Sequence, residues 1–165
     1  MVDFYEDVRR IAVEIALVEV KKHVKEEGTK NYGPEIAKYK KAAHSPKEKE
    51  HGWCGMFVHW CYKEAANRVG VCLPFRPESL WRGNKLYKWA MANPYSFVYT
   101  SPILPGDIYV LSKNNMNHIG LVIEEMTDSA IMQTIDGNQS YEDSGRDSLV
   151  KRTRHFAETS FIVRI

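Results

Sequence analysis

Apolar residues recur at helical spacing through the first part of the chain. They follow one another at steps of three and four, which is the pattern of one apolar face on an amphipathic helix. The residues of this stripe are Phe4, Val8, Ile11, Ile15 and Val18. The stripe predicts a helix over residues 1–27 that ends before Gly28.

Three further segments predict helices. Pro34 is suited to the first turn of a short helix that runs through Tyr39 and Ala43. Residues 53–70 return to helical spacing, with Gly70 where a C-terminal cap is expected. A fourth helix is predicted from about Ser79 to the break at Asn93.

After Pro94 the pattern changes to short runs rich in β-branched and aromatic residues. The predicted strands cover residues 97–99, 107–111, 118–123, 131–135, 149–150 and 161–165. The segments between them are short and turn-like, and turns of this length do not hold crossover helices, so the sheet should be mainly antiparallel. We therefore expect an α+β fold, with N-terminal helices packed on a C-terminal sheet of about five to six strands over residues 97–165.

Composition adds limits to this picture. The chain has 165 residues, 44% of them hydrophobic, and we expect a single domain over 1–165 with one substantial core. A net charge of +2 does not indicate a nucleic-acid partner. No run is long and apolar enough to span a membrane, and the N-terminal residues lack the order of a secretory signal. We expect a monomer made in the cytoplasm without a signal peptide.

Cys54 is the first candidate for chemistry. It stands at the start of the predicted helix over 53–70, where unpaired amides and the helix dipole favour a thiolate. Cysteine is often simply buried, and this reading is kept for Cys61 and Cys72. Three cysteines are too few and too scattered to indicate a disulfide framework.

His118 is the candidate base, because it opens a strand directly after a polar loop and can there accept a thiol proton. Asp136 and Asn138, at the end of another strand, are candidates to orient its ring. Each of them alone is also explained as a turn former. The other five histidines are assigned to solvent or packing: His23, His44, His51, His59 and His155.

Three stretches, taken in order, resemble the CHAP domains, which are cysteine- and histidine-dependent amidohydrolases and peptidases. Residues 53–60 (WCGMFVHW) resemble the nucleophile helix of that family, residues 105–108 with 118–122 its histidine hairpin, and residues 135–138 (IDGN) the strand of its third catalytic residue. Residues 31–34 with Tyr39 resemble the segment before the nucleophile, so the likeness extends over about residues 25–165.

The resemblance implies a papain-like arrangement that cleaves amide bonds of bacterial peptidoglycan. It implies Cys54 as nucleophile and His118 as base, with Asp136 preferred over Asn138 as the third residue. Some members carry Gln before the cysteine, whereas Trp53 stands here, so backbone amides including that of Cys54 are expected to form the oxyanion hole and the second donor is unidentified.

The resemblance does not indicate which bond of peptidoglycan is cleaved. Loops such as 114–117 and 139–147 should form the substrate groove. Tyr141 and Trp81 are candidates to line it, although packing in the core is the favoured interpretation for Trp81. Some phage members have a calcium loop, but residues 45–53 lack its ladder of acidic residues, so we expect no calcium and no other cofactor.

Two other classes of function remain as alternatives. One is a zinc-dependent hydrolase that uses His44, His51, Cys54 and His118, whose spacing fits no standard zinc signature. The other is a non-catalytic module that binds the cell wall. As a hydrolase, the protein is expected to reach the wall by a route other than Sec, as a secreted antibacterial effector with an immunity protein or as a phage-type endolysin.

Overall fold

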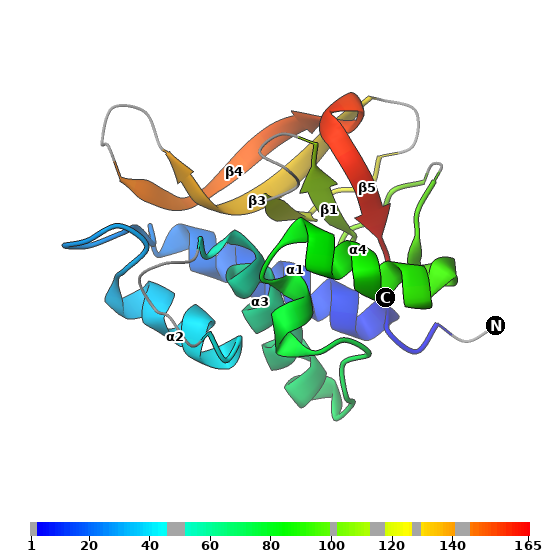
Figure 1. The fold of residues 1–165 in the computed structure, drawn as a ribbon, viewed down its shortest axis with the longest axis horizontal. Coiled ribbons are helices and arrows are strands. Elements are labelled where there is room, and N and C mark those ends of the chain that lie inside the picture. Colours follow the sequence, from blue (N-terminus) through cyan, green and yellow to red (C-terminus); the bar gives the residue numbers. More distant parts are fainter. Residues whose placement is uncertain (1–2, 46–51, 100–101, 113–117, 127–129, 141–145) are drawn as a thin grey trace.

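The computed structural model describes residues 3–45, 52–99, 102–112, 118–126, 130–140 and 146–165. Four α-helices come first along the chain and lie on one side of a sheet formed by the later part (Figure 1). The helices are α1 (Glu6–Lys21), α2 (Pro34–Ala42), α3 (Cys54–Val69) and α4 (Gly83–Ala92), with short 3-10 turns η1 (Pro77–Leu80), η2 (Pro94–Ser96) and η4 (Phe156–Glu158). The predicted α+β class is confirmed.

Five strands form one antiparallel sheet in the order β4-β3-β2-β1-β5. They are β1 (Ile108–Leu111), β2 (Ile119–Val122), β3 (Ile131–Ser140), β4 (Asp147–His155) and β5 (Thr159–Val163). Each pair of neighbours is antiparallel, as the short connections predicted. The short strand β2 is therefore in the middle of the sheet.

The first helix is shorter than the sequence pattern predicted. It ends at Lys21, and His23 then adopts a left-handed backbone conformation with φ of 54°. The chain next runs beside β4, where Lys25 forms a bridge with Ser148 and the Glu26 amide donates to the Asp147 carbonyl at 2.9 Å. The expected end at Gly28 was wrong because the apolar stripe stops near Val18, while the polar residues after it are held by the sheet.

The helix predicted from Ser79 to Asn93 is divided into two parts. The turn η1 ends at Leu80, and Arg82 is extended, with φ of −151°, before α4 begins at Gly83. In the sheet, β3 and β4 extend beyond their apolar residues because backbone hydrogen bonds continue through polar positions. Residues 97–99 form only the isolated bridge between Phe97 and Val163.

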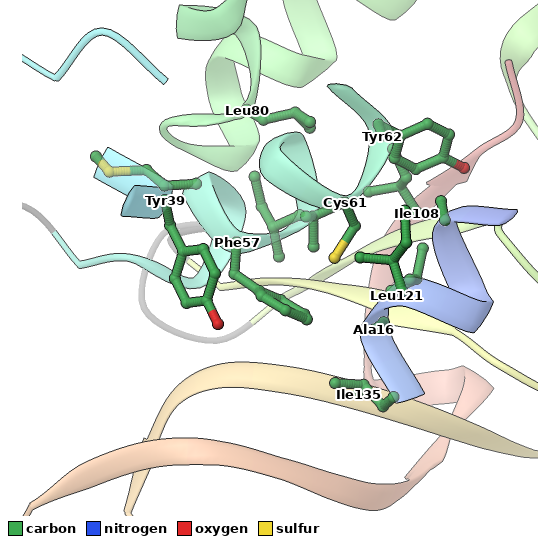
Figure 2. Close-up of a cluster of buried hydrophobic side chains, with 14 of the residues drawn as sticks. Ala16, Tyr39, Phe57, Cys61, Tyr62, Leu80, Ile108, Leu121 and Ile135 are labelled. Carbon is green, nitrogen blue, oxygen red and sulfur yellow. The ribbon is translucent and has the colours of Figure 1, made fainter. Parts of the chain in front are cut away.

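Strand alternation divides the buried residues between two faces of the sheet. Ile108, Leu121 and Ile135 face the helices and pack with Phe57 and Cys61 of α3 (Figure 2). The residues directly before and after each of them along its strand point to the opposite face. That face carries a smaller apolar cluster of Ile103, Tyr109, Leu111, Val122, Met126, Met132 and Ile162.

Candidate active site

Cys54 is the first residue of α3, and its side chain is only 4% exposed. The first intrahelical bond of this turn is donated by the Phe57 amide to the Trp53 carbonyl, at 2.9 Å. The amides before Phe57 therefore have no helical partner, and that of Gly55 is directed at the sulfur of Cys54. The first turn contains no acidic residue to offset the helix dipole. Both features favour a thiolate.

Trp53 fixes the start of this helix from the side of the core. Its indole is fully buried, stacks on Tyr39 at a centroid distance of 6.0 Å, and donates from Nε1 to Oε1 of Glu26 at 3.4 Å. Gly137 of β3 lies against the same ring, so that a Cβ at position 137 would be 2.7 Å from Cζ3 of Trp53. The absence of a side chain at Gly137 thus allows β3 to approach the nucleophile.

His118 immediately precedes β2 and is 8% exposed. It forms a side-chain hydrogen bond with Cys54, and the amide of the next residue, Ile119, also donates to the sulfur. Nε2 of His118 lies 3.5 Å from Oδ2 of Asp136. This is an ion-pair contact and not a close hydrogen bond, since Nε2 has no hydrogen-bond partner among the described residues.

Asp136 of β3 is completely buried. Its carboxylate accepts hydrogen bonds from the Tyr109 hydroxyl of β1 and from Nε of Arg154 of β4, the latter at 2.9 Å. Burial alone would raise the pKa of Asp136, but the contacts with His118, Arg154 and Tyr109 outweigh it and keep the pKa below its ordinary value. The carboxylate therefore remains charged inside the protein.

The two reactive groups influence each other in opposite directions. Burial opposes ionisation of the Cys54 thiol, yet the hydrogen bond and charge of His118, with the Ile119 and Gly55 amides, lower its pKa. Burial also disfavours the charged His118 ring, but Asp136 and Cys54 outweigh it and raise its pKa to about 9. A thiolate beside an imidazolium is the favoured state near neutral pH.

Asn138 is placed differently from the three residues above. It lies within the bulge of β3, where the register with β4 shifts between Asp136 and Gln139, and its φ is 56°. Its amide nitrogen lies over Gly52, at 3.0 Å from the position of a Cβ there. The structure thus brings Cys54, His118 and Asp136 together and places the Asn138 side chain beside the segment that leads into α3.

Three residues at the site were missed by the sequence analysis. Tyr109 contacts Asp136, Gln139 lies with Nε2 at 3.1 Å from Nδ1 of His118, and Arg154 contacts both Asp136 and Gln139. A glycine inside the apolar strand 118–123 signals a close approach of neighbours, and Gly120 does lie under the Tyr109–Asp136 contact. No sequence pattern indicated Gln139 or Arg154.

The remaining cysteines and histidines differ in environment. Cys61 is fully buried in the core (Figure 2), where burial raises the pKa of its thiol, and Cys72 is exposed. His59 is buried against Phe75, and burial lowers its pKa to about 4. His51 lies outside the described residues.

The structure describes only part of the expected substrate groove and of residues 45–53, where some family members have a calcium loop. Trp81 is half-buried at the edge of the core, donates from Nε1 to the Ala43 carbonyl at 2.8 Å, and also lines an open hollow of about 250 Å³. Tyr141, residues 114–117 and most of residues 45–53 lie outside the described residues.

The described residues contain no group of three or more histidine, cysteine or acidic side chains arranged to hold a metal ion. None of the helices they contain has the length and apolar character required to cross a membrane.

Comparison with known proteins gives a family but no individual relative. No curated protein and no solved structure matches the chain significantly. The family model of the CHAP domain matches residues 46–138, which include Cys54, His118, Asp136 and Asn138. The match covers more than half of the chain and agrees with the resemblance found in the sequence. The chain therefore belongs to the CHAP domain family, whose members are cysteine- and histidine-dependent amidohydrolases and peptidases of peptidoglycan.

Proposed function

We propose that the protein is a peptidoglycan hydrolase that cleaves an amide or peptide bond with Cys54 as nucleophile and His118 as base. The observation that carries the proposal is the contact of Cys54 with His118, which in turn lies 3.5 Å from the buried carboxylate of Asp136. A thiol with a lowered pKa beside a histidine with a raised one is the arrangement that nucleophilic thiol catalysis requires.

In the proposed reaction, the Cys54 thiolate attacks the carbonyl carbon of the scissile amide and forms a tetrahedral oxyanion. Backbone amides at the start of α3 stabilise that charge. His118 gives its proton to the leaving nitrogen, the C–N bond breaks, and an acyl-enzyme thioester remains. Water, deprotonated by His118, then attacks the thioester and releases the new carboxylate and the thiol. Asp136 stabilises the imidazolium and remains ionised throughout.

For the biological role, we propose delivery to a cell wall by a route other than Sec, as an antibacterial effector or a phage-type endolysin. An effector would be matched by an immunity protein that covers the Cys54 groove. Expression of the protein in bacteria with and without an added periplasmic signal tests this role. Lysis only with the signal is expected, and growth unaffected by the exported protein would contradict the proposal.

The proposed reaction is tested by digestion of purified sacculi and mass spectrometry of the released fragments. Each cleavage of an amide should add one water and create one new amine and one new carboxylate, with the glycan chains intact, and the fragments identify the bond. Binding of sacculi without fragment release would instead support the wall-binding alternative. Loss of cleavage on treatment with a chelator, restored by zinc, would support the zinc hydrolase.

A further inference from the structure

The open hollow beside Trp81 and the first turns of α4 is strongly basic. Its volume is about 250 Å³, and its lining residues are Trp81, Arg82, Asn84, Lys85 and Lys88. Three of these five side chains carry a positive charge, and none carries a negative one. The sequence has no aspartate or glutamate between Glu78 and Asp107, so this whole segment offers no carboxylate to neutralise the hollow.

Trp81 gives the hollow a fixed wall. Its indole Nε1 donates to the Ala43 carbonyl at 2.8 Å, which holds the ring in one orientation. Nζ of Lys85 lies over this ring, 4.5 Å from its centroid, in a cation–π contact. Arg82 and Lys88 are exposed, and neither forms an ion pair with another described residue. Their charges are therefore available to an anion that enters the hollow.

The hollow is also close to the nucleophile. A Cβ at Gly55, the residue after Cys54, would be 1.8 Å from the carbonyl oxygen of Leu80. The backbone of Leu80 therefore lies directly on the first turn of α3, and Trp81 is the next residue along the chain. An extended peptide spans about 3.5 Å per residue, so a substrate held at Cys54 needs only a few more residues to reach the hollow.

We propose that the hollow is a substrate subsite that binds a free carboxylate of a peptidoglycan stem peptide while the scissile bond lies at Cys54. The guanidinium of Arg82 can donate two parallel hydrogen bonds to a carboxylate, and the ammonium groups of Lys85 and Lys88 add charge. Stem peptides contain an acidic residue and end in a carboxylate, so they supply the complementary groups. The inference rests on the proposed function, because it takes peptidoglycan as the substrate.

The first test is co-sedimentation of Cys54→Ala protein, which by the proposed mechanism does not digest the wall, with purified sacculi free of phosphate polymers. Each protein is measured on native sacculi and on sacculi whose carboxylates have been converted to amides. In this background, the hollow triple variant carries Arg82→Gln, Lys85→Gln and Lys88→Gln.

A control triple variant loses the same total charge elsewhere on the surface. It replaces three exposed cations, on α1, at the far end of α3 and on β4. The substitutions are Lys21→Gln, Arg68→Gln and Lys151→Gln. A difference between the two triple variants therefore reports the place of the charges and not their number.

We expect the hollow triple variant to bind native sacculi about tenfold more weakly than its parent at about 50 mM salt, where screening is weak. Amidation of the sacculi should weaken binding of the parent about tenfold and that of the hollow triple variant less than about twofold, because the two changes remove the same contact. The control triple variant should stay within about twofold of the parent on both kinds of sacculi.

The second test uses proteins in which Cys54 is intact. The hollow contacts a part of the substrate remote from the reacting bond, so it should bind the ground state and the transition state equally. The three glutamine substitutions should therefore raise the sacculus concentration that gives half-maximal rate about tenfold and leave the maximal rate within about twofold. A lower maximal rate at an unchanged half-saturating concentration would contradict the subsite.

Three binding results would overturn the proposal. One is equal binding of the two triple variants to native sacculi. Another is an equal loss in the hollow triple variant on native and on amidated sacculi, because its cations would then meet no carboxylate. The third is binding through the hollow only to sacculi that retain phosphate-rich polymers, which would assign it to a phosphate ligand.

Failure of the proposed function gives a different result from failure of the subsite. Wild-type protein that binds sacculi through the hollow but releases no fragments would keep the subsite and contradict hydrolysis. Digestion of sacculi at equal half-saturating concentrations by both sets of substitutions would do the reverse. Thermal melts check folding, and the double variant Arg82→Gln/Lys88→Gln, which keeps the Lys85 contact with Trp81, decides the question if the triple variant does not fold.

Discussion

At the scale of single residues, the balance between burial and contacts decides the charge of the site. Cys54 and Asp136 are buried groups whose pKa would rise by desolvation alone, and His118 is a buried group whose pKa would fall. In each case the contact with its neighbours outweighs desolvation. The three side chains are thus charged because they are together.

This balance predicts the dependence of the reaction on pH. Turnover should be high from below neutral pH up to about 9, the pKa of His118, and should fall above it, because a neutral ring cannot protonate the leaving nitrogen. Alkylation of Cys54 should not fall there, because the thiolate persists when His118 loses its proton. The two profiles, measured on the same protein, check the assignment.

His118→Ala provides the control for this prediction. Without the imidazolium, burial is the largest influence on the pKa of the Cys54 thiol and raises it. Alkylation should then require a pH above 9.0, the ordinary pKa of a cysteine thiol. A variant that still alkylates at neutral pH as fast as the wild type would show that His118 does not ionise the cysteine.

Asp136→Asn and Asn138→Ala should have unequal effects on turnover. Asp136 is next to Nε2 of His118, and loss of a carboxylate that stabilises an imidazolium costs about 100-fold or more in rate. The Asn138 side chain lies beside Gly52, so we expect a loss below about tenfold there. Rates at neutral pH, with melts to confirm folding, decide the matter. A larger loss in Asn138→Ala than in Asp136→Asn would reverse the two roles.

The sequence indicated the chemistry of Cys54 and His118 because each stands at the end of an element, where patterns are easiest to locate. Asp136 and Asn138 could not be ranked, because residues two apart on a strand share a face unless a bulge intervenes. The bulge between Asp136 and Gln139 is visible only in the pairing with β4. Arg154 is brought to the site by that same pairing, which no local pattern specifies.

At the scale of elements, the middle strand β2 leaves space for a contact between its two neighbouring strands, because Gly120 has no side chain. Tyr109 of β1 is paired with Gly120 of β2, and Leu121 with Ile135 of β3, so Gly120 lies between Tyr109 and Asp136 on one face. A Cβ at Gly120 would be 2.4 Å from both Oδ1 of Asp136 and Cε1 of Tyr109. The contact between these side chains crosses β2 at Gly120, which has no side chain to separate them.

Gly120→Ala should therefore impair the site. The added methyl group overlaps the Tyr109–Asp136 contact, and overpacking of this kind costs about 1–3 kcal/mol. Turnover should fall more than about tenfold, since displacement of Asp136 affects His118. Denaturant unfolding and the turnover rate are the measurements.

Gly28→Ala is the matched control. It has open space at its Cβ position and a φ of 75°, so it should cost about 1 kcal/mol of stability and leave turnover intact. If both variants lose activity to the same degree, the loss follows stability and not the Tyr109–Asp136 contact.

Helices and strands could be predicted from the sequence where their buried residues recur at regular spacing. Helix α3 agreed with its pattern because buried residues lie along its length. The end of α1 and the lengths of β3 and β4 did not, because polar residues there are ordered by backbone hydrogen bonds to a distant partner. Those bonds join Lys25 and Glu26 to β4 and extend the β3–β4 hairpin.

At the scale of the whole molecule, the last residues of the chain secure the sheet that carries the histidine hairpin. Arg164 donates from Nε and Nη2 to the two oxygens of Asp107, each at 2.7 Å. Asp107 is completely buried at the start of β1, which pairs with β2 directly after His118. The fold therefore depends on a buried carboxylate that one C-terminal cation neutralises.

Arg164→Met should lower stability by about 2 kcal/mol, because it leaves the Asp107 carboxylate buried without its cation. The value is below that of wholly buried pairs, since the Arg164 side chain is 27% exposed. For a domain of this size the melting temperature should fall by about 4–8 °C. Thermal unfolding monitored by circular dichroism measures the effect.

Arg10→Met is the control for this change. Arg10 contacts Asp7 and Glu14 on the exposed face of α1, where ion pairs contribute little to stability. An equal fall in melting temperature for the two variants would contradict the importance of the Asp107–Arg164 pair.

The most direct test of the account compares Cys54→Ala with Cys61→Ala in the digestion of purified sacculi, with released amines as the readout. Both cysteines are buried in α3, but only Cys54 contacts His118. The account predicts that Cys54→Ala loses at least about a thousandfold in rate while its melting curve is kept, and that Cys61→Ala remains active. Digestion by Cys54→Ala at the wild-type rate would contradict the account.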